Sequence, residues 1–349
     1  MRLHLQTAFL IGSCLIFGLF SFVATTLKYD SPESKALSTP EQSHMEAEAY
    51  YRRRSTKKQH EHDVDSPDYF TTAQNGVFFF IHVPKTGGTT IRDNFSNTSR
   101  FPAVTYLAVY SLKQFRAAKA LLDSRLSGRH TMKTSSSNEI LFVEVHGHNT
   151  PSLLDLERQL RDWKEQARAN NIPFFVFTVL REPLDLAVSF FNFFHVFGDK
   201  RFGPQMKASL VNLRRTLQWN PQCLYLVKGE RPYFRPDLSY NVSQQDCDNV
   251  AALLQDNRVL DWVGDTERLS KDTLPMLVQM IQGNQRTRGV SSDNGDLSSL
   301  SLQASNVAST RQQRNEPLSK SALDSVTVEE IRRFTRLDSE LYESILRRP

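Results

Sequence analysis

Cysteine is scarce in this chain, which has three among its 349 residues. Three cysteines cannot build the framework of a small disulfide-stabilised domain, so a hydrophobic core must hold the fold together. Cys14 lies in an apolar stretch. Cys223 and Cys247 are therefore either one disulfide in an oxidising compartment or two separate buried thiols, and the sequence does not choose between these states.

Internal repeats and nucleic-acid-binding motifs are also absent from the sequence. The formal net charge is +5, and residues 1–75 hold 8 basic and 9 acidic side chains, so the positive excess belongs to the rest of the chain. A basic domain of this kind favours an anionic cofactor and an acidic polymer as partners, and we expect no nucleic acid. The 23 phenylalanines are enough for the well-filled core of one sizeable domain.

Residues 5–27 form an uncharged apolar run that is long enough to span a bilayer. A cleaved signal peptide is the alternative, but Phe22 stands where cleavage after Ala24 requires a small residue. We therefore predict an uncleaved signal-anchor of type II, with residues 1–4 in the cytosol and the rest of the chain lumenal. Residues 28–75 are polar without a sustained period, which predicts a flexible stem before a domain at 76–349.

The stretch Val-Phe-Phe-Phe-Ile-His-Val-Pro-Lys-Thr-Gly-Gly-Thr-Thr occupies residues 77–90. Its first half is a continuous apolar run, which predicts a strand buried on both faces. Pro84 ends the ladder pairing, and Gly87 and Gly88 allow a sharp turn. The sequence therefore predicts a strand that ends in a tight turn.

A helix is expected directly after this turn, with Thr89 or Thr90 as its N-cap. Backbone N–H groups of the turn and of the helix N-terminus would converge there, and Lys85 adds a full positive charge. The motif therefore predicts a site for a phosphate-like anion. The alternative is an ordinary strand–turn–helix unit with a lysine in solvent.

Two further buried strands are predicted at residues 140–145 and 174–180, separated by an amphipathic helix at 153–169 that Thr150 or Ser152 opens. Strand, helix and strand in this rhythm predict an α/β fold, a parallel sheet flanked by helices. Ligands of such sheets bind at the carboxyl ends of the strands. The residues that fall at these ends are Lys85, His146 and Arg181.

Other elements have weaker signals. We expect a helix within 103–122, a short strand at 259–263, a helix from Ser270 to Gln282, a loop-rich segment at 283–317, and a final helix that runs from a capping box at Thr327 to about 346. Glycosylation sequons begin at Asn94, Asn97 and Asn241, and the first of these is expected on the helix after the glycine turn.

Arg181 is followed by Glu-Pro and then by a phenylalanine-rich helix, in which Ser189 lies eight residues beyond the arginine. A guanidinium and a hydroxyl so placed can hold one phosphate between them. The alternative is a salt bridge at the helix start and a serine bonded to its own helix. The phenylalanines of this helix are expected in the core.

His146 and His148 are two residues apart at a strand end, so both side chains face the same way in extended geometry. Imidazole is suited to taking a hydroxyl proton at neutral pH, and we prefer His148 as the base, with His146 orienting it or the acceptor. Zinc is the alternative for a His-x-His pair, but no acidic partner set is evident and no metal is expected. His82 and His195 are assigned to packing.

Three motifs in this order resemble the Golgi membrane-anchored carbohydrate sulfotransferases: Val83-Pro-Lys-Thr-Gly-Gly-Thr-Thr90, His146-Gly-His148, and Leu180-Arg-Glu-Pro183 with Ser189. The likeness is greatest to the uronyl and heparan sulfate 2-O-sulfotransferases, although the glycine pair is nearer to the loop of the 6-O enzymes. It implies a P-loop-like sulfotransferase fold that binds 3′-phosphoadenosine-5′-phosphosulfate (PAPS). The residues that the resemblance implies for the donor are Lys85, Thr86, Gly87, Gly88, Thr89, Thr90, Arg181 and Ser189.

The resemblance further implies transfer of a sulfuryl group to a glycan hydroxyl, expected to be a uronic acid 2-hydroxyl of a glycosaminoglycan, in the Golgi lumen. The catalytic residues expected are Lys85, His148 and His146. A 6-O or other carbohydrate sulfotransferase is one alternative, and a membrane-tethered protein that binds anionic glycans without turnover is another. A nucleotide kinase is disfavoured, because in its phosphate loop the lysine follows the glycines and here it precedes them.

Overall fold

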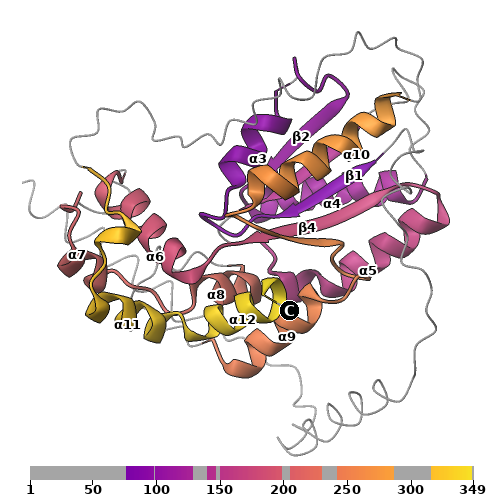
Figure 1. Ribbon diagram of the computed structural model, residues 1–349. Helices are drawn as coiled ribbons and strands as arrows, with labels where there is room; N and C mark the ends of the chain where they lie inside the picture. Colours follow the sequence, from indigo (N-terminus) through magenta and orange to yellow (C-terminus); the bar gives the residue numbers. More distant parts are fainter. Residues whose placement is uncertain are drawn as a thin grey trace, which may run out of the picture. The chain divides into compact units, whose positions relative to one another are not determined.

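A computed structural model describes residues 76–97, 99–128, 140–146, 150–198, 205–229, 242–286 and 316–347 (Figure 1). All of them belong to the unit that spans Asp65–Pro349. The predicted anchor at 5–27 and stem at 28–75 lie outside the described residues. No helix within the described ranges is long and apolar enough to cross a membrane.

Five parallel strands form one sheet, in the order β2-β3-β1-β4-β5. The strands are β1 (Val77–Ile81), β2 (Val104–Val109), β3 (Ile140–Val145), β4 (Phe174–Leu180) and β5 (Trp262–Asp265). The three central strands are buried along their whole length, as their continuous apolar runs predicted. The predicted α/β class is confirmed.

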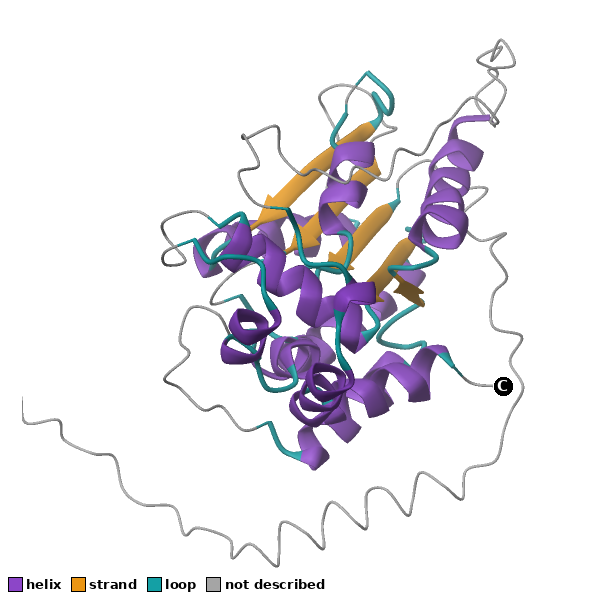
Figure 2. Ribbon diagram, turned by 60° about the vertical axis from the view of Figure 1, so that its left-hand side comes forward, coloured by secondary structure: helices purple, strands orange, loops and turns teal. Residues whose placement is uncertain are grey.

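Helices cover both faces of this sheet (Figures 1 and 2). One face packs against α4 (Leu112–Leu126), α5 (Leu153–Ala169), α8 (Pro221–Lys228), α9 (Gln244–Leu254) and α12 (Arg336–Leu346), and the other against α3 (Gly88–Phe95) and α10 (Leu274–Arg286). Alternate residues of β1 serve the two cores: the Phe79 ring lies 5.6 Å from Trp163 of α5, whereas Phe78 stacks on Phe142 in the opposite layer.

A smaller apolar cluster lies beyond β4. It is built by α6 (Pro183–Phe191), the π-helical turn η2 (Asn192–Val196), α7 (Leu210–Arg215) and α11 (Ser325–Phe334). The π-helical turn η5 (Leu269–Thr273) precedes α10, and the short 3₁₀ helix η7 (Lys320–Ala322) precedes α11. Pro183 opens α6 at the first helical position, two residues after Arg181.

The strongest sequence signals match the structure residue for residue. Strands β3 and β4 and helix α5 have the predicted bounds, and Ser152 caps α5 in a capping box with Asp155. Asn94 lies on α3 as expected and is buried, with its amide donating to the Thr90 carbonyl at 2.7 Å, so this sequon is inaccessible to glycosylation.

Weaker signals were misread in four places. Segment 103–122 does contain the expected helix, which starts at Leu112, but the half-exposed edge strand β2 before it was not expected. The last strand begins at Trp262 and not at residue 259. Ser270 caps nothing, because it lies inside the π-helical turn η5. Thr327 is not an N-cap either: Asp324 accepts its N–H at 2.7 Å, so the helix starts earlier, and it divides into α11 and α12.

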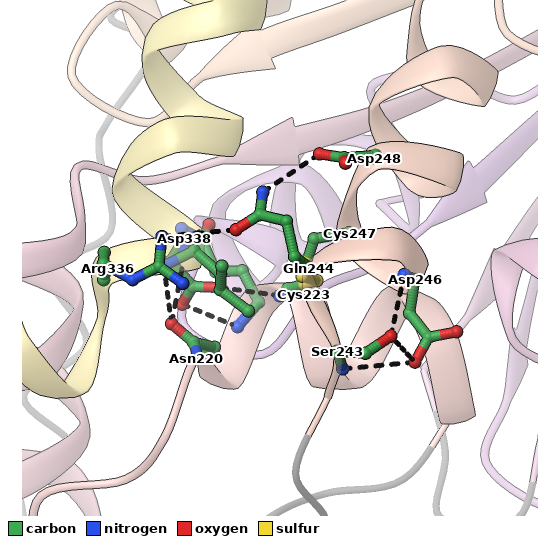
Figure 3. The surroundings of a disulfide bond; sticks show 11 residues. Asn220, Cys223, Ser243, Gln244, Asp246, Cys247, Asp248, Arg336 and Asp338 are labelled. Carbon is green, nitrogen blue, oxygen red and sulfur yellow. Dashed lines mark hydrogen bonds between the residues drawn. A yellow bond between two sulfur atoms is a disulfide. The ribbon is translucent and has the colours of Figure 1, made fainter.

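Cys223 and Cys247 form a disulfide, which settles the alternative that the sequence left open (Figure 3). It joins α8 to α9, two helices on the same face of the sheet. Closing a loop with a sequence separation of 24 stabilises a folded domain by about 3 kcal/mol in the chain-entropy description.

Candidate active site

The turn after β1 is built by two glycines and a buried threonine. Gly87 has φ 95°, a left-handed conformation that a side chain disfavours. A Cβ on Gly88 would overlap the imidazole ring of His82, so this backbone must pass directly beside the ring. The Thr86 hydroxyl donates to the carbonyl of Val83 at 2.8 Å and closes the turn from inside.

Helix α3 begins without a side-chain cap, which corrects the prediction that Thr89 or Thr90 would provide one. Its N-cap is Gly87, which has no side chain, and the first helical bond runs from the N–H of Ile91 to the Gly87 carbonyl at 3.2 Å. Thr89 is exposed and Thr90 is buried inside the first turn. An uncapped helix start with converging N–H groups favours binding of an anion.

Lys85 lies in this turn with φ 67°, unusual for a residue with a side chain. Its Nζ lies 3.7 Å from the centre of the Phe193 ring, and within the described part of the chain no carboxylate pairs with it. Burial and, to a smaller extent, the neighbouring charge of Arg181 together lower the pKa of Lys85 to about 8. An anion bound here would supply the missing counter-charge.

Arg181 reaches the same turn from the end of β4. Its Nη1 donates to the Lys85 carbonyl at 3.1 Å. The nearest acids of its own segment, Glu182 and Asp185, are instead paired with Lys320 at 3.1 and 3.2 Å. Burial lowers the pKa of Arg181, against the opposing influence of these two carboxylates. Two partly buried cations thus lie together without a carboxylate partner of their own among the described residues.

This pair lies where ligands of open parallel sheets bind. β1 and β4 are neighbours in the sheet, but the connection after β1 leads through α3 to β2 at one edge, while the chain after β4 leads to β5 at the other edge. Connections that diverge from neighbouring strands leave a crevice at their carboxyl ends. The turn with Lys85 follows β1 and Arg181 follows β4, so both cations flank this switch point.

His146 follows β3, the other neighbour of β1, and stacks on His82 with ring centres 3.8 Å apart. Its Nδ1 lies 3.1 Å from the His82 carbonyl. A carbonyl only accepts hydrogen bonds, so Nδ1 carries the proton, and in neutral imidazole Nε2 then keeps its lone pair. His146 is thus prepared as a proton acceptor, whereas His148 lies outside the described residues.

A buried carboxylate that no sequence motif indicated supports this histidine stack. Glu144 of β3 is fully buried and accepts from His82 Nδ1 at 2.5 Å, Arg92 Nε at 2.9 Å and the Tyr106 hydroxyl at 2.6 Å. Burial alone would raise the pKa of Glu144, but the His82 and Arg92 donors outweigh it and hold that pKa well below its ordinary value. A lone acid within an apolar strand was the signal for such a network.

His82, Glu144 and His146 also offer ligand atoms within 4.8 Å of one another, a spacing that a metal ion could use. The carboxylate is already saturated, however, because Arg92 binds both of its oxygens and Tyr106 binds one. A cation would have to displace that guanidinium. We therefore assign the group to hydrogen bonding and not to a metal centre.

Two residues of the segment after β4 were expected in different roles, Ser189 at a phosphate and Phe193 in the core. Ser189 is half-buried on α6, and no hydrogen bond among the described residues joins its side chain to Arg181 or to the glycine turn, so its predicted role at a phosphate stays a prediction. Phe193 is 46% exposed in the π-helical turn η2, where it covers the Lys85 ammonium, so its assignment to the core was wrong. A π-turn shifts a side chain off the helical period, which no pattern in the sequence announces.

The structure therefore brings Lys85, Arg181 and His146 together at the carboxyl ends of the three central strands, with the amides of the glycine turn beside them. A comparison with protein-family models returns no match to this chain. A comparison with curated proteins returns none either.

Proposed function

We propose that this chain is a PAPS-dependent sulfotransferase that acts on a hydroxyl of a glycan. The observation that supports it best is the pair Lys85 and Arg181, two partly buried cations that have no carboxylate of their own among the residues the structure describes, beside an uncapped helix start. The 5′-phosphosulfate and the 3′-phosphate of one PAPS molecule would together offset these two charges, and the former would accept the open N–H groups. The strand order, with the loop after the central strand at the switch point, suits the P-loop-like fold of the family that the motifs resemble.

In this proposal the amides of the turn, from Thr86 through Gly87 and Gly88 to Thr89 and Thr90, hold the 5′-phosphate. Arg181 holds the 3′-phosphate together with the hydroxyl of Ser189 on α6. The Lys85 ammonium stabilises the negative charge that develops when the bond between sulfur and the bridging oxygen breaks.

PAPS supplies the sulfuryl group to the acceptor oxygen. The product nucleotide, 3′-phosphoadenosine 5′-phosphate, leaves with the electrons of the broken bond between sulfur and the bridging oxygen. His146 takes the proton of the acceptor hydroxyl at Nε2, because its Nδ1–H is held by the His82 carbonyl. His148, which the sequence analysis preferred as the base, is the alternative acceptor of this proton. Glu144 keeps the His82 ring in place beneath His146. None of these steps requires a metal ion from the chain.

The acceptor that we propose is a uronic acid 2-hydroxyl of a glycosaminoglycan, on the strength of the motif resemblance. Two exposed aromatic side chains, Tyr110 and Phe193, contact His146 and Lys85 respectively and offer flat surfaces to a sugar ring. The 6-hydroxyl of a hexosamine is the alternative. We further propose that residues 5–27 anchor the chain in the Golgi membrane with the catalytic domain in the lumen.

A transfer assay tests the proposal. Full-length protein is incubated with PAPS carrying radioactive sulfate and with a panel of chemically desulfated glycosaminoglycans, and the position of the label is read from disaccharide analysis. We expect label at the 2-hydroxyl of a uronic acid, lost in Lys85→Ala and retained in Lys113→Ala, an exposed lysine on α4.

Label at another position would contradict the acceptor and keep the chemistry. Binding of the nucleotide and of the glycan without any transfer would favour the second candidate, a membrane-tethered glycan-binding protein. Absence of nucleotide binding would refute both the reaction and the donor.

A further inference from the structure

Gln222 holds the backbone of Arg181 from both sides. Its Oε1 accepts the N–H of Arg181 at 2.9 Å, and its Nε2 donates to the carbonyl of the same residue at 2.8 Å. Gln222 is fully buried, on the first turn of α8, and comes from a part of the sequence 41 residues beyond Arg181. These bonds fix the point at which the chain leaves β4.

Two interactions with other helices hold the start of α8, where Gln222 lies. The buried Asp338 of α12 accepts the N–H groups of Gln222 at 3.0 Å and of Cys223 at 2.8 Å. Cys223 is bonded to Cys247 of α9, and Figure 3 shows Asp338 reaching α8 beside this disulfide. The start of α8 is therefore tied to two other helices, one by hydrogen bonds and one covalently.

The chain of contacts continues into the anion site. Gln222 binds the backbone of Arg181, and the side chain of Arg181 donates to the carbonyl of Lys85 at 3.1 Å. Lys85 holds a left-handed backbone conformation, which persists only where the surroundings impose it. A shift of the Arg181 backbone would therefore move one cation directly and release the other.

We propose that Gln222 is a positioning residue for the anion site, and that the Cys223–Cys247 disulfide and Asp338 hold Gln222 in the place where it aligns Arg181 with Lys85. The inference rests on the proposed donor site for the identity of the ligand. It assigns the disulfide a role in donor binding, in addition to its role in stability.

The test compares Gln222→Met with the wild-type protein. Methionine has nearly the same volume and shape, so the core stays filled while both hydrogen bonds to Arg181 are lost. We expect the Kd of 3′-phosphoadenosine 5′-phosphate, measured by calorimetric titration of the full-length protein, to rise about tenfold because a buried pair of bonds is lost. The KM for the glycan should stay within about twofold, since Gln222 contacts the segment of the proposed donor site.

Two further variants separate positioning from general damage. Gln222→Glu keeps an oxygen that can accept the Arg181 N–H but loses the donor to its carbonyl, so its Kd should fall between those of the wild type and Gln222→Met. Gln245→Met, at an exposed site of α9, is the matched control and should leave the Kd unchanged. If Gln222→Met binds the nucleotide as the wild type does, the inference is overturned.

The double variant Cys223→Ala/Cys247→Ala tests whether the disulfide contributes to donor binding. It also serves as the test of the proposal if Gln222→Met fails to fold. A folded double variant should bind the nucleotide several-fold more weakly, and an unchanged Kd would refute the role of the disulfide.

A wild-type protein that does not bind this nucleotide would refute the donor site and not the positioning role. The latter is then read from acetylation of Lys85 across pH, followed by mass spectrometry. Its midpoint near 8 should move upward in Gln222→Met, because Arg181 no longer lies beside the amine, and an unmoved midpoint would overturn the inference.

Discussion

Replacing Lys85 by methionine should make the ligand-free protein more stable while it abolishes transfer. The ammonium of Lys85 lies against the Phe193 ring beside the guanidinium of Arg181, and no described carboxylate pairs with it. Its charge therefore carries a desolvation cost in the free protein that only a bound anion offsets. Methionine keeps the length and apolar contacts of the side chain and removes the charge.

The size of the gain follows from the pKa. A fall from 10.5 to about 8 corresponds to a cost of about 3 kcal/mol at about 1.4 kcal/mol per pKa unit. Contact with solvent screens part of this cost, and the lost contact between ammonium and ring removes about 0.5–1 kcal/mol of favourable energy. We therefore expect the free energy of unfolding to rise by about 1–2 kcal/mol at pH 7.

Urea unfolding without nucleotide measures this difference, with Lys113→Met as a control of equal chemistry at an exposed site. The gain should be complete below pH 8 and should shrink between pH 8 and 10.5, because the folded protein releases the Lys85 proton before the unfolded chain does. A Lys85→Met variant that is less stable than the wild type, or equally stable at all pH values, would refute the assignment of an uncompensated cation.

Three further predictions concern the same site. The affinity for 3′-phosphoadenosine 5′-phosphate should fall about tenfold per pH unit above pH 8, where Lys85 loses its proton, and a Lys85→Arg variant should lack this break in a calorimetric pH series. Arg181→Ala should raise the Kd of the nucleotide at least about tenfold, whereas Arg168→Ala, at an exposed arginine on α5, should leave the Kd unchanged. Equal effects of the two variants would contradict a specific contact between Arg181 and phosphate and would indicate only a general effect of net charge. His146→Ala should lower kcat at least about 100-fold with the nucleotide Kd unchanged, and a larger loss in His148→Ala with His146→Ala near wild type would assign the base to His148 instead.

The central fold followed from the sequence because its signals were strong and local. Strands β3 and β4 are apolar without interruption, and α5 has both an apolar stripe and a capping box, so burial and local propensity agree. β2 was missed because an edge strand is only half buried, which weakens the apolar pattern. The start of α3 was placed too late, since a glycine N-cap carries no side chain that could mark it.

The site could be predicted only where residues follow one another along the chain. Lys85, His146 and Arg181 could be predicted because each lies directly in the glycine turn or at the end of β3 or β4. The groups that orient them come from distant segments: Glu144 lies 62 residues from His82, and Gln222 lies 41 residues from Arg181. Such pairs depend on packing of the whole domain, which one sequence does not reveal.

The central claim is that the turn after β1 and the carboxyl end of β4 bind the sulfuryl donor. A crystal structure of the protein with 3′-phosphoadenosine 5′-phosphate tests it most directly. We expect the 5′-phosphate on the amides of Gly87 to Thr90 within reach of Lys85, and the 3′-phosphate on the Arg181 guanidinium. A nucleotide that lies elsewhere, or one that leaves both cations without a phosphate, would contradict it.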